Sequence, residues 1–427
     1  IKGKNTYKKG LFACEINFNV KASLYLNKNK MHVKLRQTTN NIKKAVFKKE
    51  VFNHKRIQLK IKENGISDED AVLVINKSEI KNRFNLLQNL LPICKHHFAI
   101  KSCPQNVMLE EWNSLGGHFD IASNGEIELL KNLKVDITKC IHTHPIKKTS
   151  EIKFSIEQGV KTFVVDNEVE LLKFEPYKDN VNLMLRLSFS SSDATIDLSS
   201  KYGMMPNNAL KFISNAIIQG YQIVGICFHV GSQMKSNVQY LKALNTCKEI
   251  YEDLASIGIE LKILDIGGGF PFHEYETIEE LEAFFNPINN FLETHFSSVT
   301  CFSEPGRFVS SSIATLVCSV IGKSKTTSNI KYYLNEGVYG CLSNKVFDFY
   351  DMSQMNIFPN QVIQENKIFT STFFGPTCDS FDKIIDQLPL PELAIGDNIV
   401  FKNLGAYTIA SATNFNLLGN INIIIID

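Results

Sequence analysis

The stretch QIVGICFHV at residues 222–230, followed by a helical pattern over 238–256 and by ELKILDI at 260–266, decides the fold. It places an apolar run typical of a buried strand on each side of a long amphipathic helix. In both directions along the chain the same alternation recurs, from about residue 70 to residue 304. Repeated strand–helix units favour a parallel sheet, and their number favours a closed (β/α)8 TIM-like barrel over an open sheet.

The pattern changes from about residue 312 onward. Short strand-like segments follow one another there, and the helical periodicity between them is weak. These segments lie at residues 311–321, 330–335, 368–374, 398–402 and 419–426. The sequence therefore predicts an α/β protein whose barrel is followed by a C-terminal all-β domain.

Length and composition limit the classes of protein to which the chain can belong. Its 427 residues suggest about two domains. A hydrophobic fraction of 44% and a charged fraction of 21% are typical of globular proteins and exclude a wholly disordered chain. The longest apolar stretches, 313–322 and 421–426, are shorter than the roughly 18 residues that a membrane-spanning helix needs, so no membrane is expected.

Charge is distributed unevenly along the chain. Residues 1–60 contain 16 Lys and Arg against 2 Asp and Glu, and the remaining residues contain 30 against 42. The basic leader is compatible with nucleic-acid binding, but it has neither interleaved aromatic residues nor a known motif, so nucleic acid is not expected as a partner. The ten cysteines form no CxxC pair and show no zinc-ligand spacing, which indicates reduced thiols in an intracellular protein and no metal site.

Three motifs at strand ends could bind an anionic, ring-shaped ligand. ILDIGGGFP at 263–271 places three glycines after an apolar strand, where backbone N–H groups can reach a phosphate. FHVGS at 228–232 could place an imidazole over a ring and a hydroxyl on a phosphate, and SEPGR at 303–307 offers a carboxylate and a guanidinium. Taken singly, each motif also has a structural explanation: a tight turn, which is favoured for the glycines, a core or surface histidine, which is favoured for His229, or a salt bridge.

Two further motifs carry candidate nucleophiles or proton donors. FAIK at 98–101 ends an apolar strand, where desolvation is expected to lower the pKa of Lys101 and to make its neutral amine a nucleophile. GPTCDSFD at 375–382 flanks Cys378 with carboxylates that could bind an amine. A solvated lysine and an exposed turn are the structural alternatives.

The order and spacing of these motifs resemble the eukaryotic-type ornithine decarboxylase family. Members of that family are pyridoxal 5'-phosphate (PLP) enzymes with an alanine-racemase-like barrel. The resemblance extends from about residue 70 to residue 427. The matching segments are FAIKSC (98–103), GGHFDIASNGE (116–126), VVDNEVEL (164–171), FHVGS (228–232), LDIGGGFP (264–271), EPGR (304–307), NEGVYG (335–340), FGPTCDSFD (374–382) and NLGAYT (403–408).

The resemblance implies a role toward PLP for residues in the barrel. Lys101 corresponds to the lysine that forms the Schiff base with the cofactor, Glu304 to the carboxylate that faces the pyridine nitrogen, and His229 to the imidazole that stacks on the ring. The residues implied to hold the phosphate are Ser232, Gly267, Gly268, Gly269, Arg307 and Tyr407, and Gly306 is implied to bind the cofactor. Those implied to line the cofactor side of the barrel are Asp120, Glu126 and Arg186.

The resemblance also implies how a substrate is handled. Cys378 corresponds to the thiol that returns a proton to the α-carbon, and it completes a catalytic set with Lys101, His229 and Glu304. Asp348 and Asp379 correspond to the carboxylates that bind the distal ammonium, and Tyr339 is a further substrate-binding residue. Lys201 and Asp382 correspond to an ion pair across a homodimer interface. In such a dimer each active site is shared, with Lys101 from one subunit and Cys378 and Asp379 from the other.

The activity implied is the decarboxylation of L-ornithine, a small amino acid, to putrescine and CO2 in cytoplasmic polyamine biosynthesis. The implied domains are a basic leader or hinge at 1–30, a β domain built from 31–74 and 314–427, and a PLP-binding barrel at 75–313. An antizyme-type regulator and a fused S-adenosylmethionine decarboxylase domain are further partners suggested by relatives.

Other activities on this fold remain open. They are a lysine/ornithine, arginine or diaminopimelate decarboxylase, an amino-acid racemase, and a non-catalytic regulator resembling antizyme inhibitor. The HVGSQ string at 229–233 is similar to diaminopimelate decarboxylases, but those follow the active-site cysteine with Glu-Ser, whereas here Asp379 and Ser380 follow Cys378. A racemase would place a tyrosine base in this region, and a regulator would lack the residues implied to bind PLP.

Overall fold

The computed structural model describes residues 54–190, 194, 200–272, 277–347, 352, 355–359 and 367–427. The predicted leader at 1–30, the first part of the predicted 31–74 segment and Asp348 lie outside these residues.

The first part of the described chain forms a closed barrel of parallel strands. Its strands, in chain order, are β2 (Cys94–Ala99), β3 (His118–Ile121), β4 (Cys140–His142), β5 (Thr162–Val165), β6 (Asn182–Leu187), β7 (Ile223–Phe228), β8 (Ile263–Asp265) and β9 (Thr300–Ser303). Strand β9 pairs with β2 in the register Cys94↔Cys301, which closes the barrel. Phe98, Phe119 and Phe163 are fully buried, as expected for strands covered on both faces.

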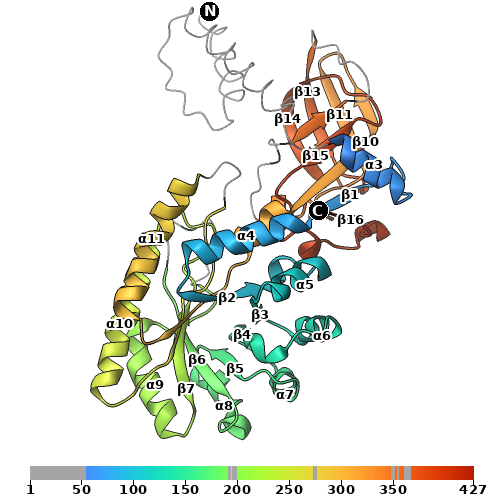
Figure 1. Ribbon diagram of the computed structural model, residues 1–427. Helices are drawn as coiled ribbons and strands as arrows, with labels where there is room; N and C mark the ends of the chain where they lie inside the picture. Colours follow the sequence, from blue (N-terminus) through green and yellow to red (C-terminus); the bar gives the residue numbers. More distant parts are fainter. Residues whose placement is uncertain are drawn as a thin grey trace, which may run out of the picture. The chain divides into compact units, whose positions relative to one another are not determined.

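Helices follow the strands and lie around the outside of the barrel (Figure 1). They are α4 (Lys77–Leu90), α5 (Asn106–Ser114), α6 (Asn124–Asn132), α7 (Thr149–Glu157), α8 (Glu168–Leu172), α9 (Ala209–Ile218), α10 (Val238–Ser256), α11 (Ile278–His295) and α12 (Arg307–Ser310). Several begin at side chains that cap free backbone N–H groups: Asn76 caps α4, Ser123 caps α6, and Thr277 forms a capping box with Glu280 on α11.

The second sheet is mostly antiparallel. Its strands are β1 (Val72–Asn76), β10 (Ala314–Lys325), β11 (Asn329–Leu334), β12 (Asn356–Phe358), β13 (Ile368–Phe374), β14 (Lys383–Pro391), β15 (Asn398–Phe401) and β16 (Asn422–Ile426). Strand β1 precedes the barrel in the sequence, yet it pairs with β10 and with β16 in this sheet. Both ends of the described chain therefore contribute to one sheet, and the predicted fold class is confirmed.

Short elements complete the fold. Helix α3 (His54–Glu63) packs Ile57 and Ile61 against Val72, Val317 and Ile424 of the second sheet. Helix α13 (Asn344–Phe347) follows β11. Single 3-10 turns lie at η1 (Ile100–Ser102), η2 (Ile137–Lys139), η3 (Glu175–Tyr177), η4 (Pro206–Asn208), η5 (Ser311–Ile313), η7 (Ile409–Ser411) and η8 (Phe415–Leu417). Across the described residues, no helix combines the length and apolar character that crossing a membrane requires.

Candidate active site

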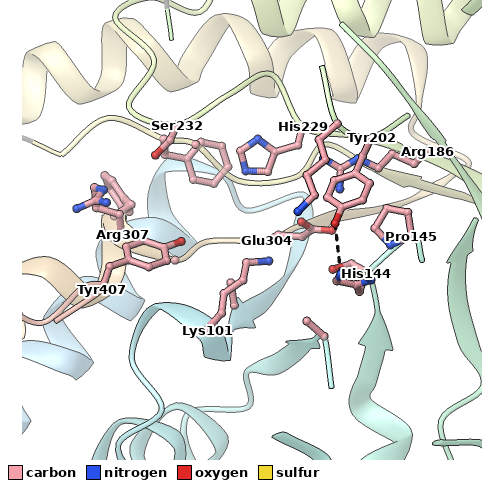
Figure 2. A pocket seen from close by; sticks show the side chains of 18 residues that line it. Lys101, His144, Pro145, Arg186, Tyr202, His229, Ser232, Glu304, Arg307 and Tyr407 are labelled. Atoms are coloured by element: carbon pink, nitrogen blue, oxygen red, sulfur yellow. Dashed lines mark hydrogen bonds between the residues drawn. The ribbon is translucent and has the colours of Figure 1, made fainter. Parts of the chain in front are cut away.

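A cavity of about 370 Å³ opens at the carboxyl ends of the barrel strands. This volume lies within the range of small-molecule sites, and this rim is where barrel enzymes place their catalytic groups. The residues predicted from sequence that line it are Lys101, Arg186, Lys201, His229, Ser232, Gly269, Glu304, Gly306, Arg307 and Tyr407. Figure 2 shows Ser232, Arg307 and Tyr407 at one end, and Arg186, Tyr202, His144 and Pro145 at the other.

Lys101 lies in η1, directly after β2, and its ammonium donates to Asp120 Oδ2 at 2.9 Å. Burial by itself would lower the pKa of Lys101, but the nearby carboxylates of Asp120 and Glu304 outweigh it and raise that pKa. The expected lowering is therefore wrong in direction for the protein without a bound aldehyde. Asp120, buried on β3, also accepts from the Thr143 hydroxyl, so both of its oxygens are held.

Glu304 directly follows β9 and lies beside Asp265, a second buried carboxylate that the sequence interpretation missed. Burial raises the pKa of Glu304, and the charges of Asp265 and Asp120 raise it further. Burial also raises the pKa of Asp265 to about 6. Asp265 accepts from Gly267 N–H at 2.9 Å. A cationic group facing Glu304 would stabilise the charged form of its carboxylate. In the sequence, the only feature that could have identified Asp265 was its position just before the three glycines.

Glu126 lies in the first turn of α6, and its pKa is affected by burial and by the charges of Asp120 and Lys101. Burial raises its pKa to about 7, although its carboxylate accepts from Ala122 N–H at 2.5 Å. The negative charge of Asp120 acts in the same direction as burial. Glu126 does not line the cavity. Through its hydrogen bond with Ala122 N–H it holds the loop after β3.

His229 follows β7 and presents a neutral imidazole to the cavity. Gly231 N–H donates to His229 Nδ1 at 3.1 Å, which leaves the proton of a neutral ring on Nε2. Burial lowers the pKa of His229 to about 3, and the positive charges of Arg186 and Lys101 contribute to this lowering. An uncharged, oriented ring of this kind is suited to stack on an aromatic ligand.

The three glycines after β8 are required by close packing. Gly267 has a φ of +68°, and a Cβ there would overlap the carbonyl oxygen of Phe228. A Cβ on Gly268 would overlap the carbonyl oxygen of Glu304. Gly269 lines the cavity, whereas Gly267 and Gly268 do not; they pack against the backbone at the end of β7 and after β9.

The end of the cavity formed by Ser232, Arg307 and Tyr407 carries hydrogen-bond donors suited to an anion. The Arg307 guanidinium lies 4.9 Å from the centre of the Tyr407 ring, Ser232 lies at the same end in Figure 2, and Gly269 lines the same cavity. Two hydroxyls, a guanidinium and exposed backbone form a donor set typical of phosphate sites. Together with Lys101, Glu304 and His229, these residues fit PLP: an amine for its aldehyde, a carboxylate for its ring nitrogen, an imidazole for its ring face and donors for its phosphate.

Three of the predicted substrate residues, Tyr339, Cys378 and Asp379, form a second cluster, which does not line this cavity of the same chain. Cys378 and Asp379 lie in the turn between β13 and β14. The Tyr339 hydroxyl donates to Asp379 Oδ2, and this hydrogen bond lowers the pKa of Asp379. Cys378 is exposed and contacts Asn416. The structure thus brings Cys378, Asp379 and Tyr339 together, but apart from Lys101.

Lys201 and Asp382 lie in different surroundings within the chain. Lys201 lines the cavity, with its ammonium 5.0 Å from the centre of the Tyr202 ring. Asp382 is 1% exposed and accepts from Val338 N–H, Thr377 N–H and the Thr377 hydroxyl, at 2.8, 3.0 and 2.8 Å. Its carboxylate is thus engaged inside its own chain, and the intersubunit ion pair stays a prediction.

The sequence interpretation missed part of the cavity wall, chiefly the residues after β4. His144 Nε2 lies 3.4 Å from the Tyr202 hydroxyl, and Ile146 N–H donates to His144 Nδ1 at 3.2 Å. Their position after a barrel strand was the signal that could have identified them. In the part of the chain that the structure describes, no group of three or more His, Cys, Asp or Glu side chains could hold a metal ion.

Comparison with known proteins agrees with this site. The family model for the pyridoxal-dependent decarboxylase, pyridoxal binding domain, matches residues 77–311. The lysine/ornithine decarboxylase of Selenomonas ruminantium is 32% identical over 81% of this chain and 86% of that protein. Antizyme inhibitor 2 of Xenopus laevis is 32% identical, and mouse ornithine decarboxylase is 30% identical, each over 82% of this chain and 79% of the relative.

Solved structures show the same architecture. The lysine/ornithine decarboxylase of Vibrio vulnificus complexed with putrescine is 35% identical, with a TM-score of 0.79 over 87% of this chain and 98% of that one. A structure described as SrLDC in complex with PLP and cadaverine is 29% identical, with a TM-score of 0.78 over 88% and 94%. The matched family, the shared fold and the donors of the cavity together show that this chain belongs to the pyridoxal-dependent decarboxylases and that pyridoxal 5'-phosphate is its cofactor.

Proposed function

We propose that this chain decarboxylates L-ornithine to putrescine and CO2, as a cytoplasmic homodimer with shared active sites, in polyamine biosynthesis. The observation that carries the proposal is the Lys101 amine, which donates to the buried Asp120 carboxylate and lines one cavity with Glu304 and with the donors Ser232, Arg307 and Tyr407. This arrangement supports an amine-exchange reaction on a phosphorylated aldehyde.

The residues of the barrel hold and polarise the cofactor. Ser232, Arg307 and Tyr407 would bind its phosphate, and His229 would cover its ring face. PLP, when bound, supplies the electron acceptor for the pair left behind as CO2 departs. Glu304 would keep the ring nitrogen protonated, because a cation relieves the repulsion that Asp265 and Asp120 impose on the Glu304 carboxylate.

The second cluster supplies the substrate end of the site. Asp379 is half-buried, and its lowered pKa keeps it ionised at neutral pH, so it can attract a distal ammonium. Cys378 beside it carries a proton that can be delivered to the α-carbon. Because neither residue lines the cavity of its own chain, we assign both to the cavity of a second copy. Asp348 is proposed, from the sequence alone, to share the ammonium.

Two alternatives are supported by particular relatives. A lysine/ornithine specificity is favoured by the 32–35% identity to enzymes of that name. A non-catalytic regulator is favoured by the similarity to antizyme inhibitor 2, which also supports an antizyme-type protein as a candidate partner. The presence of Lys101, His229, Glu304 and Arg307 in one cavity favours the enzyme.

The test is CO2 release from L-ornithine by protein purified with PLP, with L-lysine, L-arginine and diaminopimelate assayed in parallel. An absorbance band for lysine-bound PLP and preferred turnover of ornithine are expected. Preferred turnover of another substrate would overturn the specificity. A folded, dimeric protein with no such band and no turnover would overturn the enzyme and favour the regulator.

A further inference from the structure

A short segment after the second cluster adopts an unusual backbone conformation beside Cys378. Asn416 has φ +54° and ψ +16°, and Leu417 has φ +60°. Residues with a Cβ rarely occupy this left-handed region, although asparagine does so more often than most. Leu417 N–H donates to Asn414 O at 3.0 Å, and Gly419 N–H donates to Asn414 Oδ1 at 3.2 Å. The segment is thus held in shape by its own hydrogen bonds.

The side chain of Asn416 contacts the cysteine directly. Asn416 Oδ1 accepts from both the backbone N–H and the Sγ–H of Cys378, each at 3.4 Å. The neighbouring Phe415 ring stacks on Tyr339 at 4.4 Å, and Thr413 donates twice to Tyr339 O, at 2.8 and 2.9 Å. The same segment therefore contacts Cys378 through Asn416 and supports, through Tyr339, the residue that holds Asp379.

The identity of residue 416 is informative because glycine would suit its backbone better. Glycine occupies the left-handed region at no steric cost, but it has no oxygen to offer the thiol. Asparagine tolerates the conformation and supplies that oxygen. The position therefore combines a turn that can be made without a side chain with a side chain that reaches the sulfur.

From this geometry we infer that Asn416 is a positioning residue for proton delivery, which orients the Cys378 S–H and holds the sulfur in place. The inference rests on the proposed function, in which Cys378 is the proton donor. An amide oxygen accepts a hydrogen bond from a thiol, so the contact fixes the direction of the S–H bond and restrains the sulfur. In the reaction the S–H bond breaks, a C–H bond forms at the α-carbon, and the sulfur regains a proton from solvent; nothing is oxidised or reduced.

The test compares three variants of the PLP-loaded full chain. Asn416→Gly keeps the backbone conformation and removes the oxygen, and Asn416→Asp keeps an oxygen and adds a negative charge. Leu417→Gly is the matched control, because it relieves the adjacent left-handed residue, which is 80% exposed, without touching Cys378. Cys378→Ala shows the effect of losing the donor itself.

Two measurements are made on each protein. The first is the fraction of L-ornithine turnovers that end in 4-aminobutanal and the amine form of the cofactor rather than in putrescine, which reports a misdirected proton. The second is the rate at which iodoacetamide modifies Cys378 at pH 7.5, read by peptide mass spectrometry. Among the described cysteines, Cys378 is the exposed one, so its modification can be followed selectively.

In Asn416→Gly we expect the misdirected fraction and the alkylation rate each to rise about three- to tenfold, as the loss of one hydrogen bond permits. In Asn416→Asp we expect slower alkylation than in the native protein, with a nearly native product ratio. Leu417→Gly should match the native protein in both measurements. A purely structural role would not move the alkylation rates of the two Asn416 variants in opposite directions.

Two results would overturn the inference. Either Asn416→Gly matches Leu417→Gly in both measurements while Cys378→Ala misdirects the proton, or the two Asn416 variants change the alkylation rate in the same direction. If Cys378→Ala itself gives the native product ratio, the failure lies in the proposed role of Cys378 and in the proton-delivery inference with it.

Discussion

Asp382 provides the sharpest test of how the Cys378 turn is held. Its carboxylate accepts from Val338 N–H, Thr377 N–H and the Thr377 hydroxyl, and it is almost completely buried. A Cβ on Gly337 or Gly375 would overlap this carboxylate, so the chain packs tightly around it. Replacing it by asparagine puts an NH2 group where an oxygen now faces a backbone N–H.

The expected cost follows from the number of donors that lose an acceptor. Asp382→Asn leaves one backbone N–H facing the amide NH2, and a buried donor without a partner costs about 1–3 kcal/mol. The hydroxyl of Thr377 can rotate and accept from that NH2, so it adds nothing further. Thr377→Val is the matched control, because it removes the hydroxyl contact and keeps both backbone contacts.

The assay is urea unfolding of the native protein and the variants, followed by far-UV circular dichroism at two protein concentrations. If the role of Asp382 lies within its own chain, the free energy lost should not depend on protein concentration, and Lys201→Met should lose less. A loss below about 0.5 kcal/mol in Asp382→Asn would refute the reasoning. A matching, concentration-dependent loss in Lys201→Met would instead favour an ion pair between subunits.

Three further predictions follow from other parts of the structure. Gly267→Ala should weaken PLP binding at least tenfold in equilibrium titration, because the added Cβ would overlap Phe228 O. Gly258→Ala is the control: Gly258 has a similar φ of +82°, but no atom lies near its added Cβ, so this variant should bind PLP normally. Arg83→Met should also weaken PLP binding, because the buried Arg83 guanidinium donates to Phe308 O at 2.6 and 2.9 Å and so holds the helix that begins at Arg307; native-like affinity in this variant would contradict that role. Burial lowers the pKa of His142 to about 3, whereas its ordinary pKa is about 6.5. Between these two pH values the imidazole takes up a proton in the unfolded chain but not in the folded chain. The free energy of unfolding therefore falls as the pH falls from about 6.5 toward 3. His142→Phe, which removes two buried nitrogens without hydrogen-bond partners, should flatten that loss in urea midpoints measured from pH 7 to 5, and an unchanged slope would count against it.

Much of the cofactor side of the site could be predicted from local sequence. Lys101, His229, Gly269, Glu304 and Arg307 each lie within a few residues of the end of an apolar strand. Parallel strands in a closed barrel bring their carboxyl ends to one rim, so residues far apart in the chain meet there. The strand–helix alternation predicted the barrel, and the resemblance to a known family implied that these side chains face one cofactor.

Other features could not be predicted because they depend on neighbours from distant parts of the chain. The pKa of Lys101 is raised rather than lowered, since Asp120 on β3 and Glu304 after β9 outweigh its burial. The coupling of Asp265 to Glu304 likewise arises only when β8 and β9 lie side by side.

The sequence by itself determined the barrel, the sheet domain after it and the chemistry of the strand ends, because these follow from local periodicity and residue type. Only the tertiary structure decided that β1 pairs with β10 and β16, that Asp382 is enclosed within its own chain, and that Asn416 contacts Cys378. These are contacts between segments remote in sequence, and their geometry depends on how the whole chain packs.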